Sequence, residues 1–108
     1  MIVITVEKQG SFIKKINING HARFDVKGND IVCAGVSVLF FATVNTLGKL
    51  FEEGELFKVE NMVKGNASII FSNKNEVQIL ALNLLTGFEN IKYEYTQFLT
   101  IEEVNING

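Results

Sequence analysis

The sequence predicts an α+β domain in which two helices pack on one face of a largely antiparallel five-stranded sheet, in the order ββαββαβ. Three observations favour this fold class. Hydrophobic residues make up 47% of the 108-residue chain, which is enough for one core. Several short segments are rich in β-branched residues or alternate between apolar and polar side chains, as strands do. Two longer segments place apolar residues at helical spacing. We therefore expect residues 1–108 to form a single domain.

The first two strands are expected at residues 2–6 and 12–19, joined as a hairpin through the turn-like KQGS at 8–11. The following residues, 20–30, fit neither a strand nor a helix period, and they carry charge. Gly20 and Gly28 stand near the two ends of this stretch. We predict a mobile loop here, which can extend the second strand.

A long helix is expected over residues 30–53, where Gly54 ends it. Asn29 or Asp30 can accept hydrogen bonds from the free N–H groups of its first turn. The predicted inward stripe comprises Val32, Val36, Leu39, Thr43, Leu47 and Leu50. The opposite side is also largely apolar, so we expect a helix that is buried on most faces, with the Phe40–Phe41 pair in the core.

The apolar stretch at 31–51 also raises the question of a membrane span. Polar residues interrupt it at Ser37, Thr43, Asn45, Thr46 and Lys49. Because the strictly apolar part falls short of the ~20 residues that cross a bilayer, we expect a buried helix and no membrane association.

The second half of the chain repeats the pattern of a hairpin, a helix and a strand. The three strands are expected at 56–63, 67–71 and 97–104, with the helix starting near 72–75. The KGN at 64–66 favours a tight turn between the first two strands. The helix stripe comprises Val77, Leu80, Leu84, Phe88, Ile91 and Tyr95. In the last strand Leu99 and Ile101 should face inward, and the tail at 105–108 should fray.

Charge and cysteine content exclude several classes of function. The formal net charge is −2, so direct binding of nucleic acid through phosphate neutralisation is not expected. The single cysteine cannot form an internal disulfide, and no cluster of metal ligands is present in the sequence. The chain opens on a predicted strand rather than a signal peptide. We therefore expect a cytoplasmic protein that needs no cofactor.

The only histidine and the only cysteine fall in one stretch, twelve positions apart (33 − 21). Cys33 is predicted in the first turn of the long helix, where free N–H groups and the helix dipole favour a thiolate, the nucleophilic form of the side chain. A thiolate nucleophile needs a partner that protonates the leaving amine, and imidazole suits that role near pH 7. His21 is the only candidate, and the intervening loop gives it ample reach.

Neighbouring residues could support this chemistry. Ser37 lies one helical turn after Cys33 and could donate a hydrogen bond to substrate or to His21. Asp30 could orient His21 or simply cap the helix. Gly20 has no Cβ and lets another backbone come close. The first N–H groups of the helix could stabilise an oxyanion.

Each of these residues also has a simpler structural interpretation. Cys33 could be a small buried apolar side chain, and His21 a solvated loop residue. Ser37 could bond back to a helix carbonyl. Asp30 could be only a cap. The acidic residues Glu52, Glu53 and Glu55 indicate a solvated helix end. From the residues alone, an enzyme is the minority interpretation.

The paired motif formed by GHA at 20–22 and DIVCAGVS at 30–37 resembles the signature of the ribosomal-processing cysteine protease family, Prp. The later LLTGFENI is also similar to that family. Family members have about this length, so the resemblance covers the whole chain as one Prp-like domain. It implies a cysteine endopeptidase that removes a short N-terminal extension from a large-subunit ribosomal protein, acting as a homodimer.

The resemblance also implies roles for particular residues. Cys33 matches the nucleophile of the family and His21 its general acid and base. The family's loop glycine, its acidic residue and its helix serine match Gly28, Asp30 and Ser37. The loop between the histidine and the cysteine is expected to move when substrate binds.

One position departs from the family pattern, and one segment carries no family role. Gly35 stands where alanine is commoner in the family, a small change at a packed position. Residues 23–27 vary in the family and receive no role.

Two other classes of function stay open at this point. The chain could be a non-catalytic ribosome-associated factor that binds the same ribosomal protein, since a net charge of −2 suits a basic partner in either case. It could also be a structural dimer module with a redox-reactive thiol, although that reading leaves His21 and Gly20 without a role.

Overall fold

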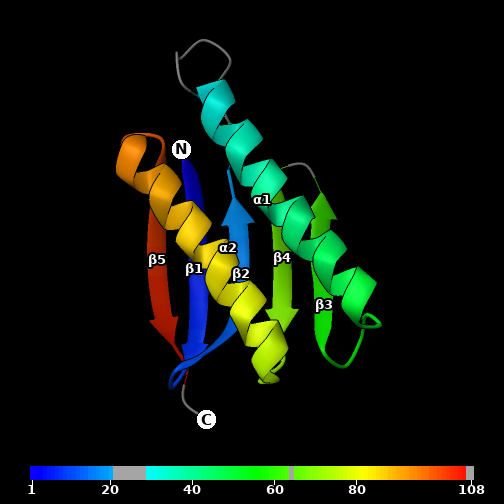
Figure 1. Ribbon diagram of the computed structural model, residues 1–108. Helices are drawn as coiled ribbons and strands as arrows, with labels where there is room; N and C mark the ends of the chain where they lie inside the picture. The colour runs from blue at the N-terminus through cyan, green and yellow to red at the C-terminus, as the bar shows by residue number, and fades with distance from the viewer. Residues whose placement is uncertain (21–28, 64, 107–108) are drawn as a thin grey trace.

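The structure is a computed structural model that describes residues 1–20, 29–63 and 65–106, and for Asn29 and Asp30 it describes the backbone only. The elements, in chain order, are β1 Ile2–Gln9, β2 Phe12–Asn19, α1 Asn29–Leu50, β3 Phe57–Val63, β4 Asn66–Phe71, α2 Asn75–Glu94 and β5 Leu99–Asn105. This is the predicted order ββαββαβ (Figure 1).

The five strands form one sheet in the order β3-β4-β2-β1-β5. Three neighbouring pairs are antiparallel, and β1 and β5 are parallel. Both helices lie on the same face of this sheet, as Figure 1 shows. The predicted α+β class, with two helices on one face of a largely antiparallel sheet, is confirmed.

The first hairpin is longer than predicted. β1 continues to Gln9, because the ladder to β2 resumes after a register shift between Glu7 and Lys8. The turn is therefore confined to residues 10–11, where Gly10 has a φ of +61°. The run of β-branched residues ends at Val6 and a turn-like KQGS follows, which is why the sequence indicated an earlier end to the strand.

The first helix is shorter than predicted. α1 ends at Leu50, and Gly54 lies in the following loop with a φ of +133°. The Glu53 carboxylate in this loop accepts a hydrogen bond from the Val59 backbone N–H at 3.0 Å. Glu53 therefore ties the loop to β3 and is not only part of a solvated helix end.

The burial of α1 corrects a second expectation. Its buried residues are Val32, Val36, Phe40, Thr43 and Leu47. Leu50, predicted in the inward stripe, is 58% exposed, and Val38 is 68% exposed. Phe41 is also exposed and packs edge-on against the buried Phe40 ring, with the centroids 5.4 Å apart. The helix is therefore buried along one stripe only.

The physical reason is the two-layer architecture. The sheet covers one side of α1 and α2 covers one flank, but the described part of the chain places no third layer over the outside of the helices (Figure 1). Residues 31–50 are long and apolar enough to cross a membrane, with a mean hydropathy of 1.9, yet this helix packs on the sheet with 28% of the stretch buried. Composition alone does not distinguish a helix that spans a membrane from an apolar helix that packs on a sheet.

The second helix and the last strand agree with the sequence. α2 buries Val77, Ala81, Leu84, Leu85 and Phe88, which include the centre of the predicted stripe. Leu99 of β5 is fully buried and Ile101 is partly buried. The Ile106 N–H donates to the Lys8 carbonyl at 2.7 Å, so the tail stays attached at this residue rather than fraying from 105 onward.

Gln78 of α2 completes the hydrogen bonding of β2. The pairing of β2 with β4 stops at Lys15, which leaves the backbone of Ile13 without a strand partner on that side. The Gln78 side chain accepts from the Ile13 N–H at 2.9 Å and donates to the Ile13 carbonyl at 2.8 Å. It also donates to the Ser72 carbonyl at 2.8 Å. One amide therefore joins β2, the end of β4 and α2.

We predict that Gln78→Met lowers the free energy of unfolding by about 1–3 kcal/mol, because it leaves partly buried backbone groups unpaired while nearly preserving volume. Urea unfolding measures this loss. Gln97→Met, at an exposed glutamine, is the matched control and should change stability by less than about 0.5 kcal/mol. Equal effects of the two substitutions would contradict the bridging role of Gln78.

Candidate active site

The candidate residues lie on the segment that leaves the end of β2 and enters α1. Gly20 and Cys33 are described, but His21 and Gly28 fall outside the described residues. Asp30 is helical by its backbone, and its side chain is outside the description. The predicted approach of His21 to Cys33, the role of Asp30 and the mobility of the loop therefore stay predictions.

Cys33 lies slightly deeper in the helix than the sequence indicated. α1 begins at Asn29, so Cys33 follows four residues later (33 − 29) and its N–H falls within the helical hydrogen-bond ladder. The free N–H groups belong to the residues before it. The thiol is partly buried and packs against the hydrophobic core. Donors for an oxyanion would therefore come from the preceding turn rather than from Cys33 itself.

The orientation of Cys33 follows from the contact between the two helices. A Cβ on Gly35 would stand 3.2 Å from Ile91 of α2, so this flank of α1 faces α2. Two residues correspond to a rotation of about 200° around a helix, which places Cys33 on the flank away from α2. Ser37 is only about 40° further round and is exposed. Cys33 and Ser37 thus share a flank that α2 does not cover.

A serine or threonine hydroxyl does bond back to a helix carbonyl in α1, but at another position. Thr43 donates to the Leu39 carbonyl at 2.8 Å, which explains how a hydroxyl is accommodated in the buried stripe. Ser37 is exposed, so burial does not impose such a bond on it.

Gly20 lies at a backbone junction where β2 ends. Its φ is +118°, a conformation that L side chains rarely adopt. A Cβ at this position would collide with the Met1 carbonyl oxygen and would come within 3.2 Å of the Ile2 Cα. The Gly20 N–H donates to the Gly65 carbonyl at 2.9 Å. The close backbone approach expected at Gly20 is therefore present, and its partners are Met1 and Ile2.

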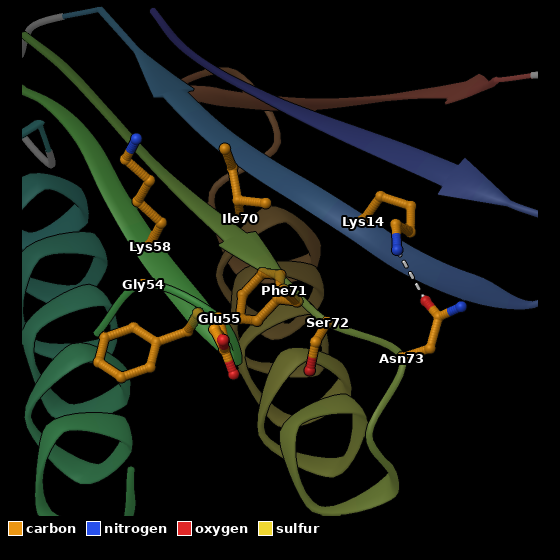
Figure 2. Close-up of a pocket in the computed structure, with 9 residues that line it drawn as sticks. Lys14, Gly54, Glu55, Lys58, Ile70, Phe71, Ser72 and Asn73 are labelled. Carbon is orange, nitrogen blue, oxygen red and sulfur yellow. Dashed lines mark hydrogen bonds between the residues drawn. The ribbon is translucent and has the colours of Figure 1, made fainter. Parts of the chain in front are cut away.

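A cavity of about 360 Å³ lies at the other end of the molecule. It is lined by Lys14, Gly54, Glu55, Phe57, Lys58, Ile70, Phe71, Ser72 and Asn73 (Figure 2). Lys14 donates to the Asn73 side chain at 2.8 Å on its rim. The loop after α1 contributes to the lining, and α1 rises about 25 Å from Cys33 to Leu50. This cavity is therefore not part of the candidate site.

None of the ion pairs between described residues involves a side chain of α1. The ion pairs between described residues join strands β1, β2, β3 and β5 or lie at the start of α2. Among residues 1–20, 29–63 and 65–106, no group of three histidine, cysteine, aspartate or glutamate side chains is placed to hold a metal ion. The chemistry that the described residues offer is that of a partly buried thiol on a helix end.

Comparison with known proteins finds one family that matches most of the chain. A family model described as cysteine protease Prp matches residues 1–100. The ribosomal processing cysteine protease Prp of Staphylococcus aureus is 30% identical over 95 residues, which cover 87% of this chain and 89% of that protein. The protein of the same name from Mycoplasma pneumoniae is 28% identical over 104 residues, covering 95% of each chain.

A solved structure extends the likeness to three dimensions. The chain matches a crystal structure of the essential ribosomal processing protease Prp from S. aureus in complex with a covalently linked product peptide. The TM-score is 0.81 at 25% sequence identity, and the match covers 95% of this chain and 99% of that one.

We predict that iodoacetamide modifies Cys33 in the folded protein, because the thiol is only partly buried. Intact mass should show one adduct per chain in native buffer. A matched control moves the cysteine to a buried position of the same helix, as Cys33→Ala with Val36→Cys, and this thiol should react far more slowly. Modification of wild type only after unfolding would show that Cys33 is inaccessible.

Proposed function

This chain belongs to the Prp family of cysteine proteases, and from this premise we propose that it removes a short N-terminal extension from a large-subunit ribosomal protein. The observation that carries the proposal is the match over residues 1–100 together with the likeness to a protease structure that holds a covalently linked product peptide. A covalent link to product is what a nucleophilic mechanism leaves when its second half is not completed.

Because the chain has one cysteine and one histidine, few residues can serve as nucleophile or as general acid and base. A cysteine protease needs a cysteine nucleophile, and Cys33 is the only cysteine in the chain. The partner that moves protons near neutral pH is most often histidine, and His21 is the only histidine. Both fall in the motif that resembles the family signature. We therefore propose Cys33 as the nucleophile and His21 as the general acid and base.

The first half of the reaction forms an acyl-enzyme. The Cys33 thiolate attacks the scissile carbonyl carbon, and the carbonyl oxygen becomes an oxyanion. Backbone N–H groups of the first turn of α1, before Cys33, would stabilise this charge. The carbon–nitrogen bond then breaks, His21 gives a proton to the leaving amine, and a thioester remains on Cys33.

The second half returns the enzyme to its starting state. His21 accepts a proton from water as the water oxygen attacks the thioester carbonyl. The carbon–sulfur bond breaks, the carboxylic acid product leaves, and the Cys33 thiolate is restored. No cofactor takes part in the proposed reaction.

Further residues receive supporting roles in the proposal. Ser37 is exposed and shares with Cys33 the flank of α1 that α2 does not cover, so its hydroxyl could hydrogen-bond an extended peptide lying across this flank. Gly28, which matches the family's loop glycine, is proposed as a supporting residue. Asp30 orients His21 or caps α1.

We also propose that the protein is a cytoplasmic homodimer that contacts neither nucleic acid nor membrane directly. The exposed apolar residues Val38 and Phe41 on the outside of α1 support self-association, because an uncharged face opposes no like charges across a two-fold axis. Light scattering during size exclusion should give twice the 12.0 kDa chain mass. A monomer mass at micromolar concentration would contradict this part of the proposal.

The proteolytic function predicts turnover of an extended substrate. Catalytic amounts of protein, mixed with the full-length ribosomal protein of the same organism, should convert it to a form that lacks an N-terminal peptide. Intact mass spectrometry follows the change. Cys33→Ala should abolish cleavage, and His21→Ala should slow it by about 10²–10⁴-fold.

The controls separate the alternatives. Cys33→Ala should still bind the substrate, which distinguishes lost chemistry from lost folding. Binding of an extended substrate by wild type without any turnover would favour a non-catalytic ribosome-associated factor. Cleavage by His21→Ala at the wild-type rate would reject the proposed dyad while keeping Cys33 as nucleophile.

A further inference from the structure

We propose that Gly20, held between the start of β1 and the β3–β4 turn, is a positioning residue that sets the direction in which His21 leaves the sheet. This inference rests on the proposed function, because it assigns to Gly20 a role that acts through the general acid and base. It concerns a part of the molecule that does not touch the substrate in the proposed reaction.

The first contact of this junction is steric. The Met1 carbonyl oxygen occupies the space where a Cβ of residue 20 would stand, and the Ile2 Cα would lie 3.2 Å from that Cβ. These are backbone atoms, and the Ile2 N–H is itself hydrogen-bonded to the Phe98 carbonyl at 2.9 Å. The start of β1 is therefore fixed between β2 and β5, and it cannot easily move aside for a side chain at residue 20.

The second contact is a hydrogen bond from the opposite side. The Gly20 N–H donates to the Gly65 carbonyl at 2.9 Å, directly after the last paired residues of the two strands, Asn19 and Asn66. Gly65 itself has a φ of +83°. The β3–β4 turn thus extends the ladder by one bond beyond the strands and holds the peptide that leads into Gly20.

These two contacts fix the conformation of the residue that precedes His21. With its N–H bonded to Gly65 and its Cα against Met1, Gly20 keeps a φ of +118° that only glycine adopts readily. The Cα of the next residue is one rigid peptide plane away. The junction therefore holds the N–H and the Cα of Gly20, the residue from which the chain continues to His21.

The chain offers a close control for backbone strain. Gly54 has a φ of +133°, near that of Gly20, but a Cβ there would meet no atom within 4 Å. It lies in the loop after α1, at the end of the helix opposite Cys33. Gly54→Ala therefore introduces a similar φ strain without the steric contact and away from the site.

The first experiment compares Gly20→Ala with Gly54→Ala for unfolding midpoint, kcat and KM on the extended substrate. Misplacing a catalytic group by about 1 Å costs about 100-fold in rate, so Gly20→Ala should lower kcat by about that factor with little change in KM. Gly54→Ala should keep the wild-type kcat. Equal kcat values for the two folded variants would overturn the positioning role.

A second readout reports on the histidine directly. Because the chain has one histidine, its imidazole gives a single set of NMR signals. In wild type these signals should shift when Cys33 is alkylated, and in Gly20→Ala this response should be lost while Gly54→Ala retains it. An unchanged response in Gly20→Ala would contradict the inference.

A double mutant separates positioning from general destabilisation. If Gly20 acts only through His21, Gly20→Ala should cause no further loss of rate in the His21→Ala background. An additional loss of about 100-fold would show that Gly20 acts on something else. Wild-type activity of His21→Ala alone would overturn the proposed dyad and this inference together, whereas an impaired His21→Ala beside a fully active Gly20→Ala overturns only the inference.

A second pair of single variants tests the inference if Gly20→Ala does not fold. Gly65→Ala strains the residue whose carbonyl holds the Gly20 N–H, and Gly10→Ala strains a turn glycine of similar φ at the opposite end of β2. Gly65→Ala should lower kcat and alter the imidazole response, and Gly10→Ala should do neither. The same kcat in both variants would reject the junction as a positioning device.

Discussion

The structure depends on the burial of two helical stripes against a single face of one sheet. Ile4, Ile16 and Ile69 come from three neighbouring strands and are fully buried, as are Leu47 of α1 and Phe88 of α2. Apolar area removed from water is the main favourable term in folding, and here nearly all of it lies between two layers. The two helices are held on the sheet by these stripes. The fit of the stripes to the sheet therefore sets where each helix lies and where Cys33 is placed.

The same constraint leaves one side of the helical layer uncovered. α1 is apolar around most of its circumference, but only the stripe from Val32 to Leu47 meets the sheet. Side chains such as Val38 remain exposed because none of the described elements forms a third layer over them. The flank with Cys33 and Ser37 is not covered by α2, because α2 packs against the opposite flank at Gly35. The Cys33 side chain on this flank is partly buried.

Hydrogen bonds at the two ends of β2 show how the sheet is joined to its surroundings. At one end Gln78 satisfies the backbone of Ile13 from a helix. At the other end the Gly20 N–H donates to Gly65 in the β3–β4 turn, and the Gly20 Cα lies close to the Met1 carbonyl oxygen. Local sequence gives no sign of these partners: Gln78 lies 65 positions from Ile13, Gly65 lies 45 positions from Gly20, and Met1 lies 19 positions from Gly20. A lone glutamine in a helix and a glycine before a histidine carry no signal that identifies what they touch.

The sequence by itself determined the order of elements, the inward stripe of α2 and the residue types available for chemistry. These follow from local periodicity and from there being one cysteine and one histidine. Only the tertiary structure decided that Phe41 and Leu50 are exposed, that Cys33 lies one turn inside α1, and that Met1 stands over Gly20. Burial and close approach depend on which distant segments meet. A periodic pattern shows that a helix has an apolar side, but the number of layers decides how much of that side is covered.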